Sequence, residues 1–200
     1  MKIGLSVLAS LIKMCAPAIS KSGRLSGFLL YTEQNKVNLI GVDGMRMIKA
    51  TANIETEEGF SCAFEASPAI RLIKGVKRGD NQETLLTIDG DYLKIDTTEE
   101  CVRIKRIDNY PDSKSLEGLI NNNDTIGALI AFDPSFVGDM AGACKEAQST
   151  GVILEGTANK NRPMVFKSCP NKDSIYSFAG VVTPLRMVEE AGAICVKNIS

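Results

Sequence analysis

The sequence of 200 residues contains no histidine, which is the usual general base at neutral pH and a common metal ligand. Catalytic triads built on an imidazole are therefore excluded. No C-x-x-C pair occurs, and the cysteines do not have the spacing of a zinc site. The six cysteines are Cys15, Cys62, Cys101, Cys144, Cys169 and Cys195. We expect reduced, buried cysteines in a protein that has no catalytic residues, no metal and no cofactor.

Long apolar runs are also lacking, since no run approaches the roughly 18 residues that a membrane span needs. The N-terminus imitates a secretory signal, with Lys2, an apolar run at 3–12 and an A-x-A cleavage-like site at 16–18. However, Lys13 closes this run early, and the same pattern recurs twice later in the chain. We therefore expect a cytoplasmic protein with no membrane partner. The alternative is export, in which the six cysteines would allow three disulfides.

An excess of charge of one sign is missing as well, because 23 Lys and Arg residues face 24 Asp and Glu residues. The formal net charge of -1 provides no global attraction to nucleic acid or membranes, so any DNA contact must come from a local cluster of cations. With 44% hydrophobic and 24% charged residues, the chain is an ordinary globular protein of one large or up to two small domains.

An internal repeat is the most informative feature that is present. One set of apolar residues has the 3-1-3 spacing of a buried helical face, and it occurs three times. The three sets are Leu8, Leu11, Ile12 and Cys15; Ala69, Leu72, Ile73 and Val76; and Val137, Met140, Ala141 and Cys144. A serine opens each expected helix, at Ser6, Ser67 and Ser135, and strand-like residues precede each one, at 3–5, 62–64 and 130–132.

Three strand-like segments follow each expected helix. They are 28–32, 37–42 and 46–54, then 84–88, 92–97 and 101–107, and then 151–156, 164–169 and 174–183. Asp-Gly pairs at 43–44 and 89–90 predict tight hairpin turns between neighbouring strands. The fold class is therefore α+β, with three repeated β-α-β-β-β units whose antiparallel sheets are each covered by one helix.

One helix on a small sheet gives too little core for independent stability, so we expect the units to associate in pairs. The first two units form a complete domain at 1–111, and a polar connector at 112–124 precedes a third unit at 125–187 and a tail at 188–200. The third unit is left with an apolar helix face and an unpaired sheet edge. We therefore expect a homo-oligomer, a dimer or a tetramer, and a two-fold contact between third units is the simplest closed arrangement.

Cations gather on the polar face of the second expected helix. The candidate phosphate contacts are Arg71, Lys74, Lys77 and Arg78, followed by Lys13, Lys21, Arg24 and Lys145. A solvated helix face is the ordinary explanation of such a cluster. The alternative is that corresponding faces of the repeated helices present cations to one surface, where they would contact phosphates of double-stranded DNA independently of its sequence.

The stretch at 41–47 combines a tight turn with an arginine between two methionines, Met45 and Met47. Two buried core methionines are the ordinary explanation. Soft, unbranched side chains beside a turn also suit a surface that accepts several apolar partners. A similar ending, with an arginine followed by a methionine, recurs at 181–187, and we expect Met45 and Met47 to line a pocket if the two stretches lie side by side.

Three stretches resemble the bacterial DNA sliding clamp, the beta subunit of DNA polymerase III. The segment 42–47 is similar to the clamp's Thr-Asp-Gly-His-Arg-Leu, and 181–187 is similar to its terminal Val-Val-Met-Pro-Met-Arg-Leu. The segment 106–112 matches the family's domain end, where Tyr or Phe precedes Pro-Asp. The resemblance covers nearly all of 1–187, but the chain has three half-domain units where a clamp subunit has six. Met45 and Thr183 depart from the family's histidine and methionine, so the peptide preference is expected to differ.

This resemblance implies a DNA-clamp fold, with antiparallel sheets outside and helices lining an inner surface around DNA. It also implies a pocket for short peptides of DNA polymerases and clamp loaders. The implied pocket residues are Val42, Gly44, Met45, Arg46, Met47, Val181, Pro184, Leu185 and Met187. We expect a processivity factor without enzymatic activity, which encircles DNA as an oligomer, and a tail able to fold across the pocket. The alternative is an adaptor or decoy that binds the same peptides and never encircles DNA.

Overall fold

The computed structural model describes most of the chain. The described residues are 1–19, 26–43, 46–56, 59–77, 79, 82–120, 134–155, 163–169, 171, 173–183, 186–190 and 193–197, and residues 134, 186–190 and 193–197 are described by their backbone alone.

The first unit has the predicted order of strand, helix and three strands. Its elements are β1 (Lys2–Gly4), α1 (Leu5–Cys15), the 3-10 helix η1 (Ala16–Ala18), β2 (Gly27–Glu33), β3 (Lys36–Val42) and β4 (Arg46–Asn53). All four residues of the predicted 3-1-3 set on α1 are buried. Ser6, which we expected to open the helix, is its second residue. Gly4 stands at the N-cap position, and no side chain caps the helix.

The second unit repeats this order. Its elements are β5 (Ser61–Glu65), α2 (Ala66–Leu72), the 3-10 helix η2 (Ile73–Gly75), β6 (Glu83–Asp89), β7 (Tyr92–Asp96) and β8 (Cys101–Lys105). Gly90 has a φ of +56°, which confirms the hairpin predicted at 89–90, since a left-handed backbone favours glycine. Glu65 precedes α2 and makes no side-chain cap, so Ser67 also lies inside its helix and not at the start.

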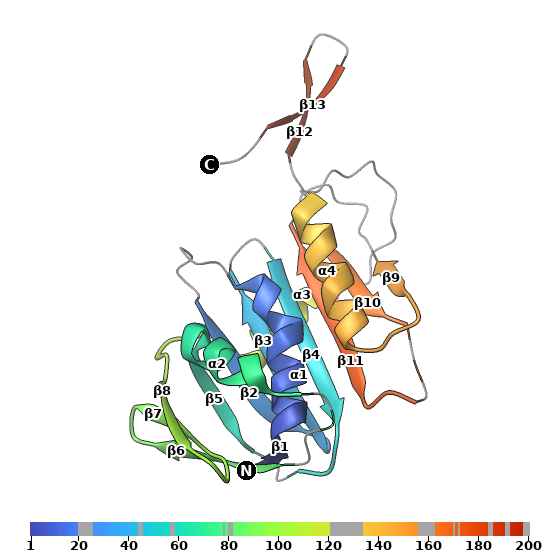
Figure 1. The fold of residues 1–200 in the computed structure, drawn as a ribbon. Coiled ribbons are helices and arrows are strands. Elements are labelled where there is room, and N and C mark those ends of the chain that lie inside the picture. The colour runs from blue at the N-terminus through green and yellow to red at the C-terminus, as the bar shows by residue number, and fades with distance from the viewer. Residues whose placement is uncertain are drawn as a thin grey trace.

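The third unit consists of α4 (Pro134–Glu146), β9 (Val152–Glu155), β10 (Met164–Ser168) and β11 (Tyr176–Val182). The strand expected at 130–132 lies outside the described residues. Beyond it, β12 (Arg186–Glu190) and β13 (Ala193–Lys197) form a hairpin whose described strands pair with each other alone. This hairpin stands off from the sheets and helices, so the described part of the tail, 188–190 and 193–197, does not fold across the pocket as expected (Figure 1).

The first two units exchange strands. β1 of the first unit pairs with β6 of the second, and β5 of the second pairs with β2 of the first, both antiparallel. A four-stranded sheet results with the order β1-β6-β7-β8, and the first unit's sheet gains β5 at its edge. The exchange explains why neither unit is expected to fold alone, because each sheet is completed by a strand of the other unit.

One edge of the third unit's sheet is paired within the same chain, whereas from the sequence we had expected an edge left for a partner chain. β11 pairs antiparallel with β4, from Arg46 opposite Val182 to Ala52 opposite Tyr176, which creates a seven-stranded sheet with the order β5-β2-β3-β4-β11-β10-β9. Met140 and Cys144 of α4 are buried in the same core as α1. The sequence could not show this pairing, because any exposed strand edge is a possible partner for β11.

Helices cover both faces of the seven-stranded sheet. α1, α2 and α4 lie on one side and enclose the main core, whereas α3 (Ser113–Ile120) lies on the other (Figure 1). The connector predicted at 112–124 is therefore partly helical. Leu116 and Ile120, one turn apart, are buried against the sheet, and the Asp112 carboxylate accepts a hydrogen bond from the Ser115 backbone amide at 2.7 Å. This hydrogen bond lowers the pKa of Asp112.

The cysteines match the expectation of burial only in part. Cys15, Cys62 and Cys144 are buried, but Cys101 is exposed and Cys169 is half-buried. Burial raises the pKa of Cys15 to about 12, so this thiol stays protonated. Within the described ranges, no group of acidic, cysteine or histidine side chains is arranged to hold a metal ion, and no helix is both long and apolar enough to cross a membrane.

Candidate functional site

The predicted cations that the structure describes lie on the side of the sheet that carries α1, α2 and α4. Those that are exposed there are Lys13, Arg71, Lys74, Lys77 and Lys145. The continuous helical patch predicted for 71–78 is wrong in one respect, because α2 ends at Leu72 and only Arg71 belongs to it. Lys74 is in η2 and Lys77 follows that turn. Lys21, Arg24 and Arg78 lie outside the described residues.

A positively charged groove runs between η1 and α2. It has a volume of about 510 Å³, and its lining includes Arg71 and Lys74 but no acidic residue. Lys13 adds a third cation nearby, since its Nζ donates a hydrogen bond to the Val76 carbonyl at 3.2 Å, just after η2. Three cations from two repeated units thus meet on one surface, which is the arrangement needed to follow a phosphate backbone.

Acidic residues are distributed unequally across this helix layer. α1 and α2 contain none, whereas α4 contains Asp139 and Glu146 beside Lys145. Asp139 accepts a hydrogen bond from Arg46, so its charge is paired within the protein. The positive potential is therefore concentrated over α1, α2 and η2 and is weaker over α4.

The two stretches that suggested a peptide pocket do lie side by side. In the sheet, Met47 lies opposite Val42 on one side and opposite Val181 on the other, so the three residues form a row across β3, β4 and β11. The condition under which we expected a pocket, that the two stretches are neighbours in the fold, is therefore met. Met47 is only 1% exposed, however, so it is a core residue here, and the expectation that it lines an open pocket is wrong.

The cover over this row is α3. Leu116 and Ile120 pack into the same apolar cluster as Val42, Met47 and Val181. Tyr110 holds the start of the segment, since its hydroxyl donates a hydrogen bond to the Gly27 carbonyl at 2.8 Å. The apolar floor expected for the pocket is therefore occupied by a helix that the sequence had assigned to a connector.

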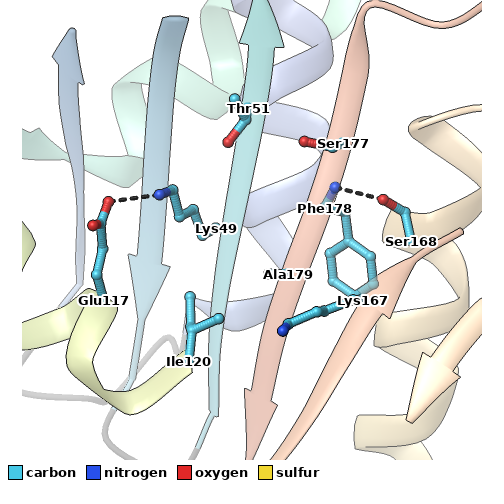
Figure 2. Close-up of a pocket in the computed structure, with 9 residues that line it drawn as sticks. All are labelled: Lys49, Thr51, Glu117, Ile120, Lys167, Ser168, Ser177, Phe178 and Ala179. Atoms are coloured by element: carbon cyan, nitrogen blue, oxygen red, sulfur yellow. Dashed lines mark hydrogen bonds and ion pairs between the residues drawn. The ribbon is translucent and has the colours of Figure 1, made fainter. Parts of the chain in front are cut away.

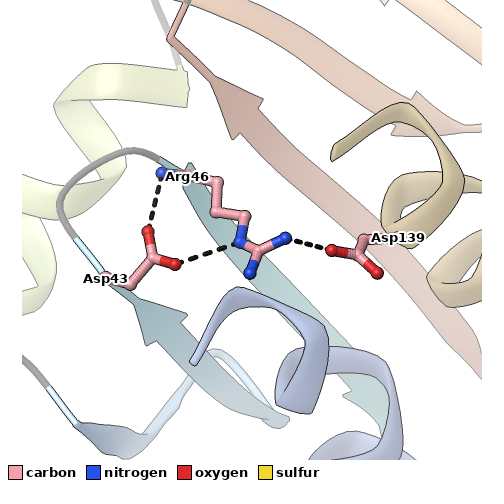
Figure 3. A network of polar contacts seen from close by, with 3 residues as sticks. All are labelled: Asp43, Arg46 and Asp139. Carbon is pink, nitrogen blue, oxygen red and sulfur yellow. Dashed lines mark hydrogen bonds and ion pairs between the residues drawn. The ribbon is translucent and has the colours of Figure 1, made fainter. Parts of the chain in front are cut away.

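Arg46 does not belong to this apolar row. Its guanidinium contacts Asp43 at 3.0 Å and also Asp139 of α4, as Figure 3 shows, and it lies 4.7 Å over the ring of Phe136. Neighbouring residues on a strand point to opposite faces. Arg46 therefore points to the face that carries α1, α2 and α4, whereas Met47 points to the face that carries α3. The prediction of Arg46 as a pocket residue is therefore wrong, and its role is to bind the first unit to the third.

An open cavity of about 280 Å³ continues the same row along the sheet (Figure 2). Its lining comes from β4, β10, β11 and α3. The lining residues are Lys49, Thr51, Glu117, Ile120, Lys167, Ser168, Ser177, Phe178 and Ala179. Sequence reasoning missed this cavity, although alternation along β4 places Lys49 and Thr51 on the face of Met47 and thus contained a signal for it.

Two ion pairs set the electrostatics of this cavity. Lys49 Nζ lies 2.5 Å from Glu117 Oε1, and Lys167 Nζ lies 2.7 Å from Glu155 Oε2. Although burial opposes the shift, hydrogen bonds from Lys49 and from the Tyr31 hydroxyl lower the pKa of Glu117. Burial and this carboxylate raise the pKa of Tyr31. A cavity with charged, internally paired walls and an apolar end at Ile120 suits a peptide that carries both polar and apolar side chains.

Several predicted pocket residues cannot be placed. Gly44, Met45, Pro184 and Leu185 lie outside the described residues. Met187 belongs to β12, which is described by its backbone alone. Of the nine predicted pocket residues, the structure therefore brings together Val42, Met47 and Val181, and it turns Arg46 to the opposite face.

Solved bacterial sliding clamps share this fold. The chain is similar to the DNA polymerase sliding clamp from Bacillus subtilis, with 16% identity and a TM-score of 0.71 over 93% of this chain and 64% of that one. A DNA polymerase III beta subunit from Thermotoga maritima has 14% identity and a TM-score of 0.67 over 92% and 63%. A Pseudomonas aeruginosa clamp bound to griselimycin has 14% identity and a TM-score of 0.68 over 93% and 65%.

The chain thus spans slightly less than two thirds of the length of these clamps. No family model matches the sequence, and no curated protein matches it either. At such low identities the likeness establishes the fold alone: antiparallel sheets with a layer of helices, α1, α2 and α4, on one side.

Proposed function

We propose that this chain, which has the sliding-clamp fold, is a processivity factor that encircles double-stranded DNA as an oligomer and tethers replication proteins by short peptides. The observation that carries the proposal is the groove between η1 and α2, where Arg71 and Lys74 face solvent without a lining acid and Lys13 lies nearby. Cations from repeated helices on one surface suit sequence-independent contact with phosphates. No bond is made or broken in such a function.

The remaining predicted cations would extend this contact. Lys77 and Lys145 are exposed on the same side, and Lys21, Arg24 and Arg78 are proposed from the sequence alone. Because the whole chain is close to neutral, this face would attract DNA while the rest of the surface would not. A closed ring of such chains would slide, because phosphate contacts carry no sequence information.

The DNA contact is tested by reversing charge at Arg71 and Lys74 together, in the variant Arg71→Glu/Lys74→Glu. The matched control is Lys36→Glu/Lys114→Glu, which changes the net charge equally but at exposed lysines at the start of β3 and in α3. We expect the first variant to lower the slope of log K against log salt by about 2, roughly one unit for each lost phosphate contact. Equal DNA affinity of the two variants would contradict the proposed contact.

Encirclement requires a separate measurement. A ring that surrounds nicked circular DNA should stay bound at high salt and should be released when the circle is cut, because it slides off the ends. A protein that only binds the backbone should dissociate at high salt from both forms. Release at high salt from the intact circle would therefore exclude the ring.

For the peptide site we propose the junction of β4, β11 and α3, where the cavity adjoins the row of Val42, Met47 and Val181. Gly44, Met45, Pro184, Leu185 and Met187 are proposed to complete it from the sequence resemblance. Ala179→Phe should fill the cavity and weaken binding of a clamp-binding peptide about tenfold or more, which corresponds to about 1.4 kcal/mol. Lys36→Glu, at the exposed first residue of β3 and outside the cavity lining, serves as the control. Unchanged peptide affinity in Ala179→Phe would exclude this cavity as the site.

The alternative is an adaptor that binds the same peptides without encircling DNA. It uses the same junction of β4, β11 and α3 and needs no groove cations. Two results together would favour the adaptor over the ring. The wild-type chain would bind peptide, and its DNA affinity would equal that of Arg71→Glu/Lys74→Glu.

A further inference from the structure

Few side chains hold α3 to the sheet. Two of its eight residues, Leu116 and Ile120, are buried, whereas eight of the eleven residues of α1 are buried. A helix this short is marginal in water unless it packs on a surface, because its first turn is costly to form. Gly118 lowers the helix propensity further. The helical form of α3 therefore depends on two apolar contacts and on the ion pair of Glu117 with Lys49.

Open space flanks α3 on both sides. One flank is the cavity of about 280 Å³ toward β11 and β10, and the other is a second cavity of about 250 Å³ toward β2 and β5. Glu117 lines both cavities, and the second is also lined by Tyr31, Ser61 and Ser113. Elements of a protein core pack without such gaps. The sheet surface beneath α3 is therefore a trough that extends beyond the helix on either side.

The surface beneath α3, which we call the α3 seat, has an apolar part and a polar part. Its apolar side chains are Leu29, Ile40, Val42, Met47, Val165 and Val181. The polar part consists of two donors to one carboxylate, since Lys49 Nζ lies 2.5 Å from Glu117 Oε1 and the Tyr31 hydroxyl donates a hydrogen bond to the same oxygen. Lys49 Nζ also lies 5.7 Å from the centre of the Tyr31 ring, so the two donors stay together. Figure 2 shows Glu117 extending from α3 to Lys49.

Charge in the adjoining cavity favours an acidic occupant. Lys49 and Lys167 line this cavity, and Glu117 is the one acid among its described lining residues. Lys167 is paired with Glu155, which lies outside the lining. Removal of α3 would leave Lys49 and the Tyr31 hydroxyl without their carboxylate. A new carboxylate at this point would restore a charge-assisted hydrogen bond, which is stronger than a neutral one.

We propose that α3 is an exchangeable occupant of its seat, and that the seat binds a partner's peptide of the same chemistry, an amphipathic segment with two apolar side chains one helical turn apart and a carboxylate beside them. The exchange deepens the proposed peptide site and rests on it for its biological role. α3 competes strongly because it is tethered, and a short tether gives an effective concentration of the order of mM. The apparent affinity of a free peptide is reduced by the fraction of chains in which α3 is seated. The chain thereby selects partners that fit the seat better than α3 does.

Two substitutions in α3 shift this competition in opposite directions. Gly118 is exposed, and a Cβ atom there would meet no atom within 4 Å outside its own helix, so Gly118→Ala strengthens the helix without a new contact. Leu116→Ala removes one of the two buried anchors and weakens the seated state. Neither residue lines the cavity of about 280 Å³.

The experiment titrates a synthetic peptide with the sequence of residues 112–120 into the full chain and follows binding by nuclear magnetic resonance. We expect the dissociation constant to fall about tenfold or more in Leu116→Ala and to rise about fivefold in Gly118→Ala, both relative to the wild-type chain. If α3 is instead a fixed wall, the peptide should bind no chain, or all three chains alike, and either result overturns the proposal. Gly118→Ala removes no contact, so the comparison with the wild-type chain holds even if Leu116→Ala does not fold.

The carboxylate is tested by a second peptide that carries Glu117→Gln. It should bind the Leu116→Ala chain about three- to fivefold more weakly than the first peptide. The two peptides should bind equally when the chain also carries Lys49→Gln, because the partner of the carboxylate is then absent. Lys36→Gln, at the exposed first residue of β3, is the matched control and should preserve the difference. Equal binding of the two peptides to Leu116→Ala would refute acid recognition at Lys49.

Hydrogen exchange separates failure of the exchange from failure of the proposed peptide site. When a clamp-binding peptide is added to the wild-type chain, the amides of 116–120 should exchange faster, whereas those of β11 should not. If Ala179→Phe weakens that peptide but the amides of 116–120 stay protected in the complex, the peptide site stands and the exchange of α3 fails. If the peptide of 112–120 follows the expected order of affinities but Ala179→Phe leaves the clamp-binding peptide unaffected, the exchange stands and the proposed site fails.

Discussion

The two sides of the third unit provide an instructive comparison. On one side, β11 joins β4 along seven residue pairs, α4 packs against α1, and Arg46 pairs with Asp139 across the junction. On the other side, β9 leaves Val152, Ile153 and Leu154 exposed. Both strands belong to the same seven-stranded sheet and both are apolar. The difference shows that the partner across the edge, and not the composition of the strand, decides whether its side chains become core.

Gly180 illustrates how closely the β11 side is packed. A Cβ atom at this position would lie 2.4 Å from the Met140 sulfur of α4 and 2.9 Å from the ring of Phe178. Only glycine lets helix and strand approach to this distance without displacement of a neighbour. No described glycine is present on β9, where no such approach occurs.

The largest expected effect is a difference in the free energy of unfolding when an apolar side chain is truncated to alanine on each of the two sides. Phe178 is 3% exposed in the core beside α4, so Phe178→Ala should lower the free energy of unfolding by about 3 to 5 kcal/mol. Leu154→Ala on the exposed edge should change it by about 0.5 kcal/mol or less in the monomer. Urea unfolding at low protein concentration measures both. Similar losses for the two variants would mean that β9 is also part of the core.

A smaller effect is expected from the charge network across the junction. Arg46→Gln should cost about 1.5 to 3 kcal/mol, because it removes the charged hydrogen bond from Arg46 to Asp43, whose side chain is 6% exposed. Arg103→Gln is the matched control, since Arg103 also pairs with an aspartate, Asp89, and lies 4.7 Å over an aromatic ring, Tyr92. That pair is more than half exposed, so its loss should cost about 0.2 to 1 kcal/mol. Equal costs would argue against a role of Arg46 in joining the units.

The smallest effect concerns the ion pair by which α3 is held to β4. The pKa of Glu117 is lowered in the folded protein, so its contribution to stability is present above the ordinary value of 4.5 and is lost as pH falls through the folded pKa. The stability difference between the wild-type chain and Glu117→Gln should therefore be about 1 kcal/mol or less at pH 7, since the pair is partly exposed. It should shrink below pH 4.5. A difference that stays constant from pH 7 to pH 3 would contradict the pairing of Glu117 with Lys49.

Much of the fold could be predicted from local patterns. The 3-1-3 spacing indicated α1, α2 and α4, and alternation with Asp-Gly turns indicated the strands of the first two units to within two residues of their observed ends. We also expected 42–47 to lie beside 181–187, but only as the condition for a peptide pocket. The register of β4 with β11 confirms that the two stretches are neighbours. The helical nature of 113–120 was missed because its polar residues obscured the spacing of Leu116 and Ile120.

The sequence by itself determined the repeated units, because helix and strand periods depend on residues that are close together in the chain. Tertiary structure alone decided that β11 joins β4, that Arg46 pairs with Asp139 of α4, and that α3 covers the apolar row. Each of these depends on a partner far along the chain, and an apolar side chain has no preference for one apolar partner that could be read from its own neighbours. For the same reason, three identical patterns of apolar residues end as two buried helix faces and one that is open at Val137 and Ala141.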